Sequence, residues 1–277
     1  MNKHLLISTL LISTLGLVAC DRVKTETKNA DANVQSNTET ASVEKKPKNN
    51  EVDIPAVWSK SYKMELVNEE ICQPETDDNI ANCIIYDVQS VKTNLDWVNQ
   101  YYDKTLKESY ADTAFGPKSD VRLEGEESDR KYYEGSLVNY EGQKYNLVTF
   151  SLFNNSYTGG AHNNFNLVYD VFDIKTQKKL TLADVLKPVA KDKVLALLKK
   201  HNSTELEEYK TDLNTLTLTE NFYFGDYGLV FVYSPYEIAP WVFGSPELTV
   251  PYDELRDLLK SEYYPDRPDY RISQEFS

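Results

Sequence analysis

Residues 131–174 read KYYEGSLVNYEGQKYNLVTFSLFNNSYTGGAHNNFNLVYDVFDI, with three runs rich in aromatic and β-branched side chains. Apolar and polar residues alternate in Lys131–Tyr140 and Lys144–Asn154, which is typical of β-strands. We expect residues 141–143 to join these two strands and Asn164–Ile174 to form a third. The third run has apolar side chains on both faces, so we expect it to pack on both sides.

Shorter strands and a few helices surround this segment. The sequence predicts a helix near residues 93–108, begun by a capping box of Thr93 and Asp96. A helical turn capped by Thr181 and Asp184 is also expected. The remaining expected elements are strands at 221–224, 229–234 and 247–250 and helices at 189–201 and 252–263. Clustered strands interrupted by helices indicate an α+β fold with antiparallel sheets.

Two cysteines flank a polar loop. Cys72 and Cys83 enclose the sequence QPETDDNIAN and lie between the apolar runs Tyr62–Val67 and Ile84–Val91. In an exported protein we expect a disulfide across the base of a β-hairpin. The alternative is a pair of thiols with a metal, but no other cysteine or histidine lies nearby at ligand spacing.

The N-terminus has the pattern of an export signal. Lys3 precedes the apolar segment Leu5–Val18, which is too short to span a bilayer comfortably and has no stop-transfer pattern after it. Leu17–Cys20 resembles the lipobox of bacterial lipoproteins, which implies that residues 1–19 are removed and that Cys20 is acylated with fatty acids such as palmitate. An ordinary secretory signal is the alternative. Asp21 resembles an inner-membrane retention signal whose rule varies between bacteria, so the choice of membrane stays open.

Residues 20–52 are expected to be a disordered tether. They contain no aromatic residue and no Leu, Ile, Phe or Met, so they bury too little apolar surface to fold. A flexible coil of this length reaches roughly 30 Å, which would hold a folded module in the periplasm or outside the cell. The positive and negative charges of the tether cancel.

The net charge belongs to the folded region. The whole chain carries −14 and Lys3 adds one positive charge, so residues 52–277 carry −15. This charge argues against nucleic acid and anionic lipid as electrostatic partners. It fits both plain solubility and attraction to a cationic partner.

Few residues suggest catalysis. Neither a metal nor a cofactor is expected, because no zinc, nucleotide-phosphate or serine-hydrolase motif is present. His201 lies at a predicted helix end before Asn202 and is expected to be structural. His162 could be a structural part of its turn, a ligand contact or, least of all, a catalytic base. A glycosidase-like pair among the carboxylates is not distinguishable here from a solvated acidic face.

Four segments carry a family resemblance. These are Tyr157–His162, Asp173–Leu186, Tyr236–Pro240 with Gly244, and Val250–Leu255. Together they resemble the extracytoplasmic module of RsiV-type anti-sigma factors, which bind lysozyme, and of PdaC-type peptidoglycan deacetylases. The resemblance implies an N-terminal α+β subdomain at 53–165 and a C-terminal one at 166–265, before a tail at 266–277. We expect no counterpart here of the sigma-binding segment, the transmembrane helix or the deacetylase domain of those proteins.

The sequence therefore predicts a lipid-anchored binding module of the cell envelope, with the bilayer as one partner through Cys20. A cationic lysozyme-like muramidase is the favoured second partner, with this protein as sensor, decoy or inhibitor. The alternative is a peptidoglycan-binding or envelope-scaffolding lipoprotein, and a cell-wall-modifying enzyme comes third. The candidate partner-binding residues are Tyr157, Gly159, Gly160, His162, Asn163, Tyr236 and Trp241.

Overall fold

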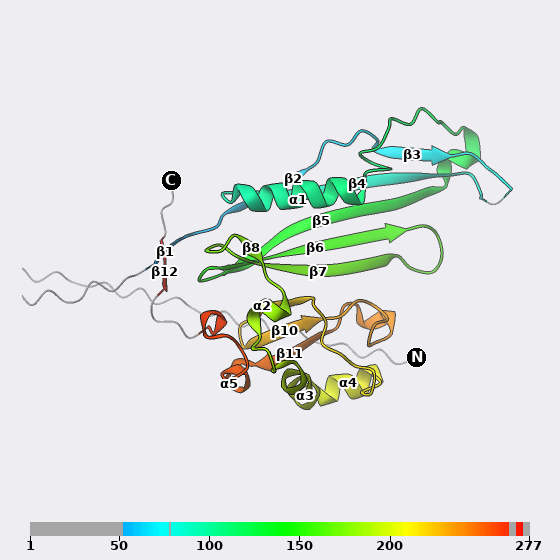
Figure 1. Ribbon diagram of the computed structural model, residues 1–277. Helices are drawn as coiled ribbons and strands as arrows, with labels where there is room; N and C mark the ends of the chain where they lie inside the picture. The colour runs from blue at the N-terminus through cyan, green and yellow to red at the C-terminus, as the bar shows by residue number, and fades with distance from the viewer. Residues whose placement is uncertain (1–51, 78, 266–269, 274–277) are drawn as a thin grey trace, which may run out of the picture. The chain divides into compact units, whose positions relative to one another are not determined.

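The strands predicted around residues 131–174 lie in the middle of a seven-stranded sheet (Figure 1). The computed structural model describes residues 52–77, 79–265 and 270–273. The strand order is β2-β4-β5-β6-β7-β8, with β3 beside β4, and only the β4–β5 pair is parallel. The strands are β2 (Ser59–Lys63), β3 (Glu70–Gln73), β4 (Asn82–Thr93), β5 (Lys131–Lys144), β6 (Leu147–Tyr157), β7 (Asn164–Asp173) and β8 (Lys178–Lys179).

Helix α1 (Asp96–Ser109) packs on one face of this sheet. Its predicted apolar face is confirmed, because Val98, Tyr102 and Leu106 are all buried. The Tyr102 ring meets Phe150 and Phe172 of the sheet edge to face, at centroid distances of 5.6 and 6.1 Å. Each such side chain contributes about 1.5–3 kcal/mol on burial. This core therefore holds α1 on the sheet.

The predicted capping box of α1 is wrong. Leu95 is the N-cap and has no side-chain capping bond. Thr93 is instead the last residue of β4, where its hydroxyl accepts from the Leu95 amide at 3.0 Å and its own amide donates to Asn99 Oδ1 at 2.8 Å. The threonine thus joins strand to helix and is already engaged when the helix begins.

The turn between β5 and β6 also differs from the prediction. β5 continues through residues 141–143 to Lys144, and the chain turns at Tyr145 and Asn146. Gly142, with φ +144°, follows a register shift between Tyr140 and Gly142. A glycine in that conformation lets the strand absorb the irregularity without ending. The Asn146 side chain donates to Asp173 Oδ1 at 2.7 Å, which fixes the actual turn.

A second core lies between the other elements and the large sheet. A three-stranded antiparallel sheet, in the order β11-β10-β9, packs with the helices of the C-terminal part. Leu147 and Val171 of the large sheet join this core, whereas the neighbouring Phe172 joins the core under α1. The prediction that the third strand packs on both sides is therefore confirmed. The elements are α2 (Leu182–Val185), α3 (Lys191–His201), α4 (Ser203–Tyr209), β9 (Phe222–Phe224), β10 (Gly228–Val232), β11 (Glu247–Pro251) and α5 (Tyr252–Leu255).

The α+β class with mostly antiparallel sheets is confirmed. The Thr181–Asp184 capping box forms as predicted at α2. The last helix is shorter than expected, because the chain leaves α5 after Leu255 and Lys260 donates its amide to Val185 O at 2.9 Å. The expected subdomain boundary at 165/166 falls inside β7, within one compact unit. The two-subdomain division stays a prediction.

The predicted disulfide is confirmed. Cys72 and Cys83 face each other in the β3–β4 hairpin and are bonded at an S–S distance of 2.00 Å. Both are buried. The first strand of the hairpin is β3, whereas the expected run Tyr62–Val67 overlaps β2.

The predictions for the chain ends fall mostly outside the described residues. These are the signal peptide at 1–19, the acylated Cys20 and the tether at 20–51. Val52 already belongs to β1 (Val52–Pro55), which pairs in parallel with β12 (Tyr270–Ser273). Four residues of the expected tail at 266–277 are thus a strand. Within the described part of the chain, no helix has the length and apolarity needed to span a membrane.

Candidate functional site

The turn between β6 and β7 contains the Gly-Gly-Ala-His sequence. Gly159 and Gly160 have φ values of +91° and +101°, a region that side chains other than glycine rarely occupy. The Tyr157 hydroxyl donates to Gly160 O at 3.2 Å and closes the turn. The two glycines thus allow the reversal that brings His162 to the start of β7.

A second loop, residues 234–245, follows β10. The Ser234 amide donates to Glu237 Oε2 at 2.8 Å, and the Tyr236 amide donates to Ala239 O at 3.1 Å. Tyr236 has φ +70°, which is unusual for a side chain of this size. The loop continues into η2, a 3-10 turn over Trp241–Phe243. These hydrogen bonds brace the loop around Tyr236.

The two loops meet at His162. Its ring stacks on Trp241 with a centroid distance of 4.3 Å and an interplanar angle of 19°. Its Nδ1 lies 2.9 Å from Asn163 O, and its Nε2 lies 3.1 Å from the Tyr236 hydroxyl. A carbonyl oxygen only accepts, so Nδ1 carries a proton, and in the neutral ring Nε2 then accepts from the Tyr236 hydroxyl. Both ring nitrogens are engaged, which suits a structural joint between the loops better than a free general base.

The sequence-predicted residues are thus brought together. His162, Tyr236 and Trp241 are in contact, and Asn163 extends the cluster by donating its side-chain amide to Asn155 Oδ1 at 2.5 Å. Tyr157, Gly159 and Gly160 belong to the same turn. We call this cluster with the 234–245 loop the two-loop surface.

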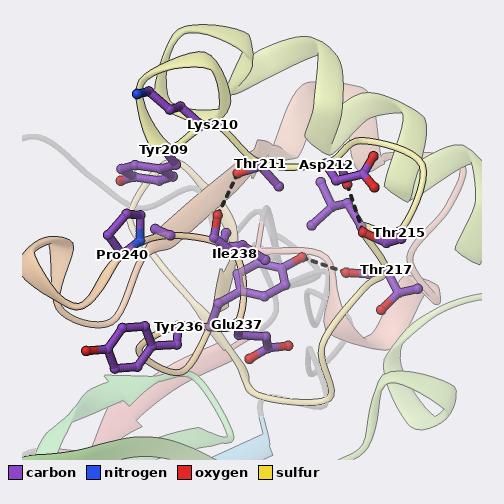
Figure 2. A pocket seen from close by; sticks show the side chains of 13 residues that line it. Tyr209, Lys210, Thr211, Asp212, Thr215, Thr217, Tyr236, Glu237, Ile238 and Pro240 are labelled. Carbon is purple, nitrogen blue, oxygen red and sulfur yellow. Dashed lines mark hydrogen bonds between the residues drawn. The ribbon is translucent and has the colours of Figure 1, made fainter.

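A hollow of about 610 Å³ adjoins the two-loop surface (Figure 2). Tyr236 lines it and also bonds His162, so the cluster and the hollow are continuous. Several polar groups in its wall bond one another: Thr211 Oγ1 donates to Ile238 O at 2.8 Å, and the Tyr233 hydroxyl donates to Thr217 O at 2.8 Å (Figure 2). The lining residues are Tyr209–Asp212, Thr215–Thr217, Tyr233 and Tyr236–Pro240.

Large apolar side chains are exposed beside the hollow. Tyr236 is 63% and Val242 78% exposed, and Phe243 contacts the Tyr209 ring at a centroid distance of 4.8 Å. The sequence reasoning missed Val242, Phe243 and Tyr209 as part of this surface. The run Trp241-Val242-Phe243 directly after Pro240 was the available signal, since an apolar run in a loop marks a contact surface when it is not buried.

His201 and the cysteine pair are engaged in contacts within the fold. His201 ends α3 before its C-cap Asn202, as predicted, and its Nε2 lies 3.1 Å from Glu254 Oε1. The pKa of Glu254 is lowered, first by the hydrogen bond from Lys200 and then by that from His201. In the described part of the chain, the one group with metal-ligand proximity is Glu70 with Cys72 and Cys83. Because the two sulfurs are bonded to each other, they do not offer thiolates.

Fold and site together define a disulfide-bonded α+β module with an aromatic two-loop surface. Residues 170–253 match the family described as "Protein of unknown function (DUF3298)", so this part of the chain is a DUF3298 domain. The match includes Tyr236 and Trp241, and His162 lies before it.

Two solved structures share the fold. A DUF3298 family protein from Pseudomonas aeruginosa PAO1 is 18% identical, with a TM-score of 0.53, and the match covers 78% of this chain and 99% of that one. A DUF3298 family member from Bacteroides fragilis NCTC 9343 is 19% identical, with a TM-score of 0.51, covering 76% and 96%. Comparison with curated proteins gave no match. At these identities the likeness concerns the fold.

Proposed function

We propose that this protein is a lipid-anchored module of the bacterial cell envelope that binds a partner protein through its two-loop surface. One observation carries the proposal: two loops more than seventy residues apart meet at His162 and present exposed Tyr236 and Val242 beside a hollow. Binding energy in protein interfaces concentrates on a few aromatic side chains next to pockets. A surface held rigid before binding loses less entropy on association.

The partner that we propose is a cationic, lysozyme-like muramidase. The resemblance to the lysozyme-binding module of RsiV-type anti-sigma factors supports this choice. The charge of −15 on residues 52–277 supports it independently, because opposite charges raise the rate of encounter. The protein would then act as a sensor, decoy or inhibitor of the enzyme.

The test is calorimetric titration of the full chain with a c-type lysozyme at low and at physiological salt. Cytochrome c serves as a basic control protein. We expect saturable binding to lysozyme that persists at physiological salt and is lost or weakened about 30-fold in Tyr236→Ala, a hot-spot effect of about 2 kcal/mol. The matched control is Tyr62→Ala, which removes a tyrosine that is 40% exposed on β2.

Two results would contradict the proposal. Binding that vanishes at physiological salt and is shared by cytochrome c would be charge attraction alone. Equal losses of lysozyme affinity in Tyr236→Ala and Tyr62→Ala would show that lysozyme does not bind through the two-loop surface.

A peptidoglycan fragment is the second candidate ligand. The hollow combines the rings of Tyr209 and Tyr236 with the hydroxyls of Thr215 and Thr217 and the carboxylate of Asp212, a mixture of stacking faces and hydrogen-bonding groups suited to sugars. Titration with a soluble muropeptide decides between the candidates. Glycan binding that is insensitive to salt, with no lysozyme binding, would favour this second function.

Anchoring is tested separately. If Cys20 is acylated, Cys20→Ser stops incorporation of labelled fatty acid and leaves the protein unprocessed or released from membranes. Label entering the variant, or wild-type protein in the soluble fraction, would exclude the lipoprotein proposal.

A further inference from the structure

A second hollow, of about 590 Å³, lies where the large sheet meets the three-stranded sheet. It shares no lining residue with the hollow beside the two-loop surface. Three tyrosines line it: Tyr169 of β7, Tyr223 of β9 and Tyr227 of the β9–β10 turn. The rings of Tyr169 and Tyr223 lie 4.5 Å apart at an interplanar angle of 31°, and Tyr227 is 87% exposed. The hollow is thus an aromatic cleft.

Two glutamates accompany the rings, in addition to Asp226 in the lining. Glu141 lines the hollow and accepts from Ser151 Oγ at 2.5 Å. Glu247 accepts from the Tyr223 hydroxyl at 3.0 Å and from the Tyr169 hydroxyl at 3.5 Å. Burial, and then the nearby Glu247 and Glu141, raise the pKa of Tyr169 to about 12. With Glu141, Glu247 and Asp226 against the single ammonium of Lys144, these groups carry a net negative charge.

Neither glutamate has an ion-pair partner among the described residues. The ion pairs of the described residues include neither Glu141 nor Glu247. Lys144 lines the hollow, but its ammonium donates to Gly225 O and pairs with Asp226. Both glutamates are exposed, so a cationic ligand can reach them.

We propose that this cleft binds an organic cation, a guanidinium or primary ammonium group that lies against the tyrosine rings and donates to Glu141 and Glu247. Aromatic faces attract cations within about 6 Å of the ring centroid. Charged donors form their strongest hydrogen bonds with carboxylates. The site does not depend on the function proposed for the two-loop surface. The cation could be a side chain of a basic peptide or a free polyamine.

The experiment is an NMR titration of the full chain with the peptide acetyl-Ala-Arg-Ala-amide. A peptide with citrulline in place of arginine has nearly the same shape without the charge, and spermidine represents the polyamines. The test variant is Glu141→Gln/Glu247→Gln, which retains oxygen acceptors. The matched control is Glu126→Gln/Glu127→Gln, which removes two exposed carboxylates from the 3-10 turn η1 (Gly125–Asp129).

We expect saturable binding of the arginine peptide or of spermidine, with shifts centred on Tyr169 and Tyr223. Whichever binds more tightly identifies the source of the cation. Its affinity should fall at least tenfold in the Glu141/Glu247 variant and less than twofold in the control. If the arginine peptide binds, the citrulline peptide should bind at least tenfold more weakly. Equal losses in both double variants, citrulline binding as tight as that of a bound arginine peptide, or no saturable binding of either cation would overturn the proposal.

Discussion

Tyr102 in the core under α1 and Tyr236 on the two-loop surface each have a hydroxyl that is hydrogen-bonded to another side chain. They differ in burial and in backbone conformation. Tyr102 is completely buried and donates to Asp170 Oδ2 at 3.0 Å. Tyr236 is 63% exposed and donates to His162 Nε2 at 3.1 Å. The first tyrosine lies in a regular helix, whereas the second has a backbone φ of +70°.

The Tyr102 region stabilises the fold, whereas the Tyr236 region exposes an aromatic ring to solvent. Around Tyr102, the buried carboxylate of Asp170 also pairs with Lys179 at 2.5 Å, so hydrogen bonds, charge and ring contacts all strengthen one core. Around Tyr236, a conformation that costs on the order of 1–3 kcal/mol holds a large ring out in solvent. Strain of this kind, kept by a surface residue, agrees with a role in binding. Substitutions in each region show whether stability and binding separate in this way.

The largest effect is expected for Tyr102→Ala. It removes a fully buried ring and leaves Asp170 without one of its donors, so the free energy of unfolding should fall by about 3–5 kcal/mol. Urea denaturation measures this loss, and lysozyme titration of the remaining folded protein should give the wild-type affinity. A loss below about 1 kcal/mol would mean that the core under α1 does not dominate stability.

Gly160→Val should cost about 2 kcal/mol. The β-branched side chain must adopt a φ near +101°, although nothing lies within 4 Å of the new Cβ, so the cost is one of backbone strain. Ala161→Val adds the same side chain one residue later and should change the unfolding free energy by less than about 0.5 kcal/mol. Equal stabilities of the two variants would remove the basis for assigning the turn to glycine.

Alkaline pH should weaken the Tyr102 region. Burial, and then Asp170, raise the pKa of Tyr102 well above 10.0, so the folded protein keeps a proton that the unfolded chain loses. Lys179 acts in the same direction: burial opposes the shift, but Asp170 outweighs it and raises the pKa above 10.5. This stabilisation is complete below pH 10 and declines as the pH rises.

The measurement is urea unfolding at several pH values from 9 to 11. Tyr102→Phe should reduce the fall in stability by up to about 1.4 kcal/mol per pH unit, the contribution of one proton. A slope identical to that of the wild type would show that Tyr102 also loses its proton in the folded protein.

The smallest effect on stability is expected for Tyr236→Gly. Glycine relieves the positive φ, which offsets the lost hydrogen bond to His162, so the unfolding free energy should stay within about 0.5 kcal/mol of the wild type. Lysozyme binding should nevertheless be lost, whereas Tyr236→Phe, which keeps the ring, should retain most of it. A destabilisation above about 1.5 kcal/mol would mean that Tyr236 contributes to the stability of the fold, as Tyr102 does.

Local sequence determined much of this fold. The alternation in residues 131–174 predicted the central strands, the apolar spacing of Val98, Tyr102 and Leu106 predicted the buried face of α1, and the Cys72–Cys83 spacing predicted the disulfide. These signals are reliable because side-chain periodicity follows directly from strand and helix geometry. The adjacent glycines of the His162 turn were also predicted from local sequence, because glycine is the residue that adopts a positive φ most readily.

The ends of helices and strands were predicted less well, because some residues there can form either of two hydrogen-bonded structures. Thr93 could cap a helix but ends a strand, and Gly142 could form a turn but follows a register shift. Both outcomes depend on residues far away in the sequence, because the Asn146 side chain donates to Asp173 at the turn and Thr93 pairs with Ser59 of β2. The sequence next to Thr93 and Gly142 does not indicate which of the two structures forms.

The sequence by itself determined the α+β class, the disulfide, the acidic charge and two candidate loops. Only the tertiary structure decided that His162 stacks on Trp241 and accepts from Tyr236, and that Tyr169, Tyr223 and the two glutamates form one cleft. Periodicity specifies which side of an element is buried, whereas contacts between segments depend on how the two sheets pack. Sites assembled from several loops therefore emerge only when the whole chain is folded.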